Sequence, residues 1–122
     1  MTKRDSQRFP AAVYGVGEEP DPRFSLANER TFLAWVRTGL ALIAGGVAAD
    51  AVRLSVPDPL HEAVVLILLA LGLLVPASAW IHWARTERAL RLARPLPGSR
   101  VVLPLAVGVL ALAALILVGV LQ

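Results

Sequence analysis

The sequence contains no cysteine, which excludes disulfide bonds, thiolate catalysis and cysteine-based metal sites. A cleavable signal segment is not expected either, because the first basic residues precede a stretch rich in proline, glycine and acidic residues rather than an apolar run. The sequence shows no arrangement of residues typical of a catalytic or cofactor site. The motifs sought are a nucleophile–base pair, a carboxylate dyad, a metal-ligand set and a phosphate-binding glycine loop. We therefore expect a protein that is not an enzyme and that uses no metal or cofactor.

Apolar residues dominate what is present. Of the 122 residues, 57% are hydrophobic, and the mean hydropathy of +0.66 is well above that of a soluble domain of this size. They form three long blocks of about 20 residues, and at about 1.5 Å of rise per residue each block spans about 30 Å, one hydrocarbon thickness. The sequence predicts an all-α integral membrane protein, multi-pass in the plasma membrane, with three transmembrane helices.

The chain divides into a tail and one membrane domain. Residues 1–21 are polar and lack periodicity, which is typical of a mobile tail. Residues 22–122 form the transmembrane domain, and its helices are expected at about 25–54, 62–94 and 101–121. Ser25 is the expected N-cap of the first helix, and Pro76 should kink the second or make it flexible.

Basic residues are concentrated on one side of the predicted membrane. Before and within the start of the first helix stand Lys3, Arg4, Arg8, Arg23 and Arg30. Between the second and third helices stand Arg85, Arg88, Arg91, Arg94 and Arg100. The connection between the first two helices offers Arg53 alone. Because cytoplasmic loops carry the excess of arginine and lysine, we expect a cytoplasmic N-terminus and a C-terminus outside.

One face of the first helix combines arginine with small residues. Arg23, Arg30 and Arg37 recur every seven residues and so fall within about 20° of one stripe. The stripe continues as Ala34, Ala41, Ala44, Gly45 and Ala48. Snorkelling arginines and close helix packing explain these features without a further function. Alternatively, the stripe lines a wet axis in a homo-oligomer, which would spare an arginine its cost of ~2.5–3.5 kcal/mol at the centre of a lipid bilayer.

Other charged residues flank the membrane. Glu29 is interpreted as pairing with an arginine of a neighbouring subunit or of the second helix, the alternative being a simple charge effect at the helix N-terminus. Arg85, Arg88 and Arg91 recur every three residues and form a basic ridge that serves as a topology signal and lipid-headgroup site, or widens an entrance for anions. His82 stands alone, so metal binding is not expected. The basic segments are too short and too close to lipid for nucleic-acid binding.

The run DPRFSLANERTFLAWVRTGLALIAGG, residues 21–46, resembles the YidH-type family of small bacterial membrane proteins, a family of unknown function. The ANERTFLAW segment is its most specific part. The resemblance implies a three-span layout from residue 21 to the C-terminus.

The same domain is similar to the small membrane subunit of the yeast vacuolar transporter chaperone complex, whose three-helix units form a pentameric ring through which polyphosphate passes. This similarity implies that Arg23 and Arg30 take the places of pore-lining basic residues, Glu29 that of an acidic neighbour, and Arg85 that of a basic residue after His-Trp. Arg37 departs from the yeast pattern, and this chain carries no polymerase or inositol-phosphate-sensing domain.

Two functional hypotheses result. The first is a homo-oligomeric membrane assembly whose basic cytoplasmic mouth binds or conducts an anion such as polyphosphate or another phosphate-rich species. The second is a non-conducting structural or accessory protein that binds anionic lipid and a partner membrane protein. Substitution of Arg30 and Arg37 separates them, because only the first hypothesis predicts a loss of anion passage.

Overall fold

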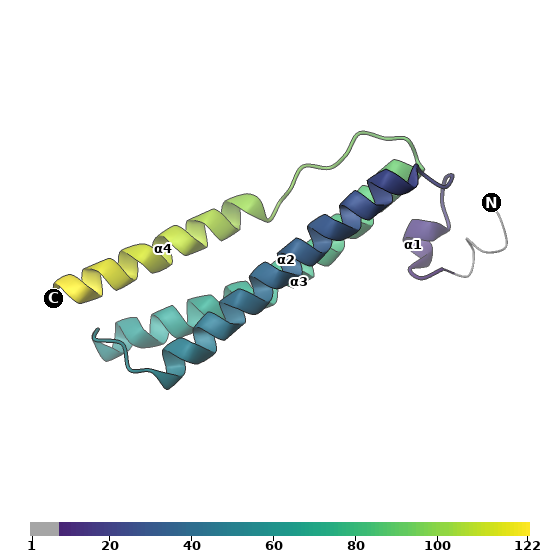
Figure 1. The fold of residues 1–122 in the computed structure, drawn as a ribbon. Coiled ribbons are helices and arrows are strands. Elements are labelled where there is room, and N and C mark those ends of the chain that lie inside the picture. Colours follow the sequence, from purple (N-terminus) through teal and green to yellow (C-terminus); the bar gives the residue numbers. More distant parts are fainter. Residues whose placement is uncertain (1–7) are drawn as a thin grey trace.

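The chain folds into three long helices and one short one (Figure 1). The computed structural model describes residues 8–122, so Lys3 and Arg4 lie outside the described residues. The helices are α1 (Ala11–Tyr14), α2 (Pro22–Ala51), α3 (Asp58–Arg91) and α4 (Val102–Leu121). The last three are each long and apolar enough to cross a membrane. The predicted all-α fold with three membrane-spanning helices is therefore confirmed.

Helices α2 and α3 form a tight antiparallel hairpin (Figure 1). Glycines make the close approach possible, because a Cβ atom on Gly39 would lie 2.9 Å from the Pro76 ring and one on Gly72 would lie 2.5 Å from Ile43. Small residues at such contacts are the usual means of helix association in lipid, where no hydrophobic force draws helices together. Helix α3 continues through Pro76, whose ring packs against the glycine side of α2.

Helix α4 lies along α3 and, among the described helices, makes close contact with that helix alone (Figure 1). An extended connection over residues 92–101 leads to it, and the C-terminus returns to the side of the α2–α3 turn. Gly108 rests against Leu71, and Gly119 rests against Val56. We call the end of the hairpin that holds the start of α2 and the end of α3 the arginine end, and the opposite end the turn end.

The bounds of the three long helices differ from the sequence expectation by four residues at most. Asp21, not Ser25, is the N-cap of α2: its carboxylate accepts a hydrogen bond of 2.9 Å from the backbone N–H of Arg23. Pro22 then occupies the first helical position, where its missing N–H has no cost. Helix α3 likewise begins earlier than expected, at Asp58, because Pro59 also fits a first turn.

Residues 8–21, expected as part of a mobile tail, are folded back on the arginine end. Helix α1 contacts α3, and the Val13 side chain is 2% exposed. The reason is that this segment satisfies the polar groups at the end of α3, as the contacts of Arg91 described below show.

Candidate functional site

Arg91 anchors the N-terminal segment to the end of α3. Its side chain is 0% exposed. The guanidinium group donates hydrogen bonds to the carbonyl oxygen of Val16 at 2.8 Å, to that of Tyr14 at 3.3 Å and to the Glu19 carboxylate at 3.2 Å. A buried guanidinium group needs acceptors for its fixed fork of donors, and this segment supplies them. The basic ridge of the sequence therefore includes one structural arginine.

A buried polar network joins α2 to α3 beside this anchor. The Glu87 side chain is buried, and its carboxylate accepts a hydrogen bond of 2.6 Å from the Ser25 hydroxyl and one of 3.1 Å from the Asn28 amide. The Asn28 amide also donates to the carbonyl oxygen of Trp83 at 3.1 Å. A hydroxyl–oxygen distance of this length is typical of a charge-assisted bond. The network sets the register of the two helices at the arginine end.

An aromatic cleft of about 420 Å³ opens next to the network. Its walls contain the rings of Tyr14, Phe32, Trp80 and Trp83, and its charged lining residues are Arg8, Glu19, Glu29 and Glu87. The Arg8 guanidinium lies 4.0 Å from the Tyr14 ring centre and 3.1 Å from Glu19. Burial acts to lower the pKa of Arg8, but the hydrogen bond and charge of Glu19 outweigh it and raise that pKa. The cleft thus already holds one cation against a ring and a carboxylate.

A second cleft, of about 300 Å³, is lined by arginine. We call it the arginine cleft, and its basic residues are Arg85, Arg88, Arg94 and Arg100. The first two are exposed on α3, and the others come from the connection to α4. Arg88 also donates a hydrogen bond of 3.0 Å to the carbonyl oxygen of Ala12. Guanidinium groups are suited to bind phosphate oxygens, and four arginines line this one cleft.

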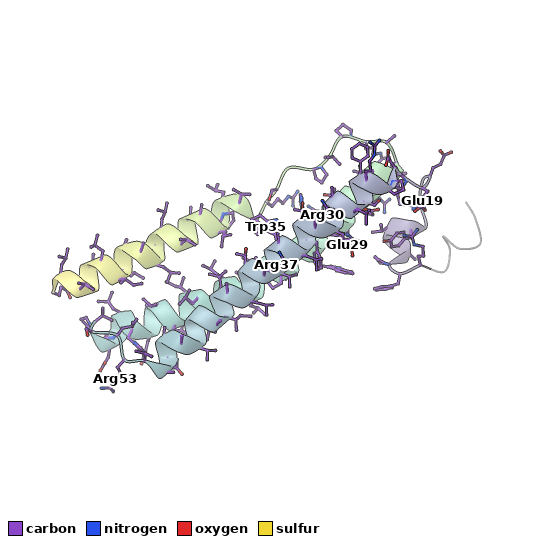
Figure 2. All side chains as sticks on the ribbon, viewed as in Figure 1. Glu19, Glu29, Arg30, Trp35, Arg37 and Arg53 are labelled. Carbon is purple, nitrogen blue, oxygen red and sulfur yellow. The ribbon has the colours of Figure 1, made fainter. Side chains whose placement is uncertain are left out.

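The arginines of α2 are distributed along its exposed side (Figure 2). Arg23 forms a salt bridge of 2.8 Å with Asp21. Arg30 and Arg37 are exposed and form no salt bridge with any residue that the structure describes, and the same holds for Glu29. The pairing that the sequence suggested for Glu29 thus has no partner within the described part of this chain.

The alanines of the small-residue stripe of α2 are not covered by α3. Ala34, Ala41, Ala44 and Ala48 are exposed, and Gly45 is half-buried near Leu68. The packing inside the hairpin uses the other side of α2, where Asn28, Gly39 and Gly46 are buried. Within one chain, the alanines of the stripe and its three arginines, Arg23, Arg30 and Arg37, are exposed.

Sequence reasoning missed the role of Ser25, Asn28 and Glu87. A signal existed for Glu87, an acidic residue inside an otherwise basic ridge, but its partners depend on the register between two helices. His82 lies 3.5 Å from the Thr86 hydroxyl. Over residues 8–122, the structure contains no group of three or more histidine, aspartate or glutamate side chains that could bind a metal ion.

Residues 23–89 match a protein family described as a domain of unknown function, DUF202. The chain belongs to this family. The matched stretch covers most of α2 and α3 and includes the whole Ser25–Asn28–Glu87 network, but neither α1 nor α4. The family match thus centres on the hairpin.

Named relatives agree with this assignment. The inner membrane protein YidH of Escherichia coli strain K12 is 40% identical over 107 residues, which cover 85% of this chain and 90% of that protein. An uncharacterized protein of Mycobacterium tuberculosis strain H37Rv is 42% identical over 81 residues, or 65% of this chain and 66% of that protein. No solved structure matches the chain. With its three apolar spans, the chain is a YidH-like, multi-pass protein of the plasma membrane.

Proposed function

We propose that this DUF202 protein binds a phosphate-rich anion at a basic cytoplasmic end and assembles with copies of itself around an axis that the anion can enter. The proposed role is that of a binding or conducting protein and not of an enzyme. The observation that carries it is the arginine cleft, where Arg85, Arg88, Arg94 and Arg100 line a single cavity. Polyphosphate is the cargo that fits a row of guanidinium groups best, since it repeats one charged unit along a chain.

Charge asymmetry supports the proposed orientation. Every described arginine near the membrane surface except Arg53 belongs to the arginine end, and Figure 2 shows Arg53 at the turn end, far from Arg30. Because arginine-rich segments stay in the cytoplasm, the arginine end is the cytoplasmic one. The arginine cleft would then draw its anion from the cytoplasm.

The exposed stripe of α2 supports the assembly. Arg37 lies two turns inside the helix from Arg30 and would face lipid in a single chain. Exposure to lipid at depth costs an arginine up to ~2.5–3.5 kcal/mol, and contact with protein or water avoids most of that cost. The alanines next to it allow close contact with another helix. A second copy of the chain placed on this stripe would cover Arg37 and pack closely against the alanines. A ring of such copies would bring the arginines around one axis.

Anion binding is tested by calorimetric titration. Short-chain polyphosphate is added to the protein in nanodiscs of uncharged lipid, and the affinity is measured at low and at high salt. We expect the combined variant Arg94→Ala and Arg100→Ala to weaken binding about tenfold or more, since each charged hydrogen bond contributes ~1.5–3 kcal/mol. Arg53→Ala is the matched control and should bind as the unchanged protein does. Equal affinity for the two variants would exclude the arginine cleft as the binding site.

Assembly and conduction need separate measurements. Native mass spectrometry should show an oligomer that Ala41→Trp dissociates, while Ala113→Trp on the exposed side of α4 leaves it intact. Liposomes containing the oligomer should pass the anion, and Arg37→Ala should reduce that flux. A stable oligomer that passes no anion, with Arg37→Ala changing lipid binding alone, would instead support the non-conducting accessory role.

A further inference from the structure

The aromatic cleft has an excess of negative charge. Three carboxylates, those of Glu19, Glu29 and Glu87, share its lining with a single guanidinium group, that of Arg8. Arg8 pairs with Glu19 at 3.1 Å. In the described part of the chain, Glu29 forms no salt bridge, and the hydrogen bonds that Glu87 accepts come from an uncharged hydroxyl and an uncharged amide. Glu19 has two guanidinium partners, Arg8 and Arg91, whereas Glu29 and Glu87 have no cationic partner among the described residues.

The lack of a cationic partner is costly for Glu87 because its carboxylate is buried. The residue is 3% exposed, and a buried carboxylate is stable only when it is hydrogen-bonded and its charge is compensated. Ser25 and Asn28 supply the hydrogen bonds but no charge. A cation that enters the cleft would supply the compensating positive charge.

The aromatic rings favour an organic cation over a metal ion. The Phe32 and Trp80 ring centres are 6.2 Å apart, and those of Trp80 and Trp83 are 5.1 Å apart. Ammonium groups are attracted to the faces of such rings within about 6 Å, whereas a metal ion needs converging oxygen or nitrogen ligands. The Arg8 guanidinium, held 4.0 Å from the Tyr14 ring centre, shows the same chemistry at one wall of the cleft. Trp80 is 43% exposed, so an incoming cation can reach its ring.

The location of the cleft points to a lipid. Tryptophan and tyrosine gather at the level of the lipid headgroups, and the cleft lies where α2 and α3 leave the apolar span. Its volume of about 420 Å³ can hold a headgroup. We propose that this cleft binds the ammonium group of a zwitterionic phospholipid such as phosphatidylethanolamine, with the ammonium group against Trp80 and Glu29. Arg8 also lines the cleft, and its positive charge suits the negatively charged phosphate of the headgroup.

This site is separate from the arginine cleft, which attracts the phosphate of any anion. The test is native mass spectrometry of detergent-solubilised protein given phosphatidylethanolamine or phosphatidylglycerol with identical acyl chains. Because the arginine cleft can hold phosphatidylglycerol by its phosphate, the unchanged protein is compared with variants for each lipid, and a change is expected for phosphatidylethanolamine. Trp80→Leu combined with Glu29→Gln should reduce its retention about threefold to tenfold, as expected for a cation–π contact and an ion pair.

Two further variants make the result specific. Trp80→Phe keeps an aromatic face and should restore most of the retention, and Trp35→Leu, a tryptophan outside the cleft lining, should leave it unchanged. Unaltered retention of phosphatidylethanolamine in the double variant, or an equal loss of both lipids in it, would overturn the proposal. Displacement of the lipid by free phosphoethanolamine at equal concentration would overturn the lipid assignment and identify a soluble amine as the ligand.

Discussion

The α2–α3 hairpin and helix α4 are held to the rest of the protein in different ways. In the hairpin, glycines bring two backbones together and a buried carboxylate is hydrogen-bonded across the contact. Helix α4 carries no ionisable residue, and its closest contacts are between glycines and the side chains of Leu71 and Val56. Backbone atoms of α2 lie close to Gly72 in the hairpin, whereas the atoms nearest to a Cβ placed on Gly108 or Gly119 of α4 belong to side chains.

The difference indicates which part of the chain specifies the structure. Apolar surface alone does not attract one helix to another in lipid, so shape and hydrogen bonds must do so. The hairpin has both, and the family match over residues 23–89 follows the hairpin and leaves α4 out. Helix α4 carries no hydrogen-bonding side chain, and its glycines Gly108 and Gly119 fit against the Leu71 and Val56 side chains. We therefore expect α4 to move more easily than α2 relative to α3.

The largest effect should come from adding a methyl group inside the hairpin. A Cβ atom at Gly72 would lie 2.5 Å from Ile43 Cγ1 and 3.2 Å from the carbonyl oxygen of Gly39, which belongs to backbone. Gly72→Ala should therefore lower the free energy of unfolding by about 2–3 kcal/mol, as overpacking does in a rigid site. Thermal unfolding in detergent, followed by circular dichroism, measures the change.

Gly108→Ala in α4 is the matched control. Its Cβ atom would meet Leu71 side-chain atoms at 2.8 Å and 3.0 Å, and that side chain can rotate away. Both substitutions gain the same helix propensity, so the difference between them reports packing alone. A Gly108→Ala variant as unstable as Gly72→Ala would show that α4 is held as rigidly as the hairpin.

The sequence was sufficient to predict the parts of the fold that depend on composition. Apolar length predicts three spans, and proline positions predict the turn before α3. The helical wheel places Arg30 and Arg37 on one side of α2 with Ala34 and Ala41, and all four are exposed in the structure. Whether that side faces an axis stays a prediction.

Contacts that depend on the register between helices could not be predicted in this way. Ser25 was expected to cap α2, yet its hydroxyl binds Glu87, 62 residues later in the chain. Arg91 was counted as one of a basic ridge, yet its side chain is fully buried against residues 14–19. Both depend on where α3 ends relative to α2, and neither apolar length nor charge counting measures that distance.

The second largest effect tests the polar network. Glu87→Gln removes one acceptor oxygen and the negative charge, so either Ser25 or Asn28 loses its partner in a buried site. The expected loss of unfolding free energy is about 1–2 kcal/mol. Glu62→Gln, the same change at an exposed position of α3 near the turn end, should shift stability by less than about 0.5 kcal/mol. Similar values for the two variants would mean that the network contributes nothing to the hairpin.

A smaller and local effect is expected at Gly17. Its φ angle is +61°, and a Cβ atom there would lie 2.0 Å from the carbonyl oxygen of Arg91. Gly17→Ala should release residues 8–20 from α3 at a cost of about 1–2 kcal/mol, without unfolding the hairpin. Hydrogen exchange of the Glu18 amide, which donates to that carbonyl oxygen at 3.0 Å, should become faster. Gly98→Ala, where a Cβ atom meets nothing within 4 Å, should leave this exchange unchanged.

The smallest effect concerns the N-cap of α2. Hydrogen bonds from the Arg23 side chain, and then from its backbone N–H, lower the pKa of Asp21 below its ordinary value of 3.8. A carboxyl group with a lowered pKa in the folded state stabilises that state fully above its ordinary pKa, and the contribution is lost as the pH falls through the lowered one. Exchange of the Arg23 amide should therefore be constant at neutral pH, after correction for intrinsic rates, and speed up only below about pH 3.8.

Asp21→Asn separates this cap from other acid effects. Asparagine caps helices about as well as aspartate but does not titrate in this range. The variant should keep the protection of the Arg23 amide at neutral pH and lose its dependence on acid. If the acid dependence survives in the variant, the first turn of α2 responds to another carboxylate, and the nearest one on the hairpin network, Glu87, becomes the group to test. The helix start would then be coupled to the buried network through Ser25 rather than held by its own cap.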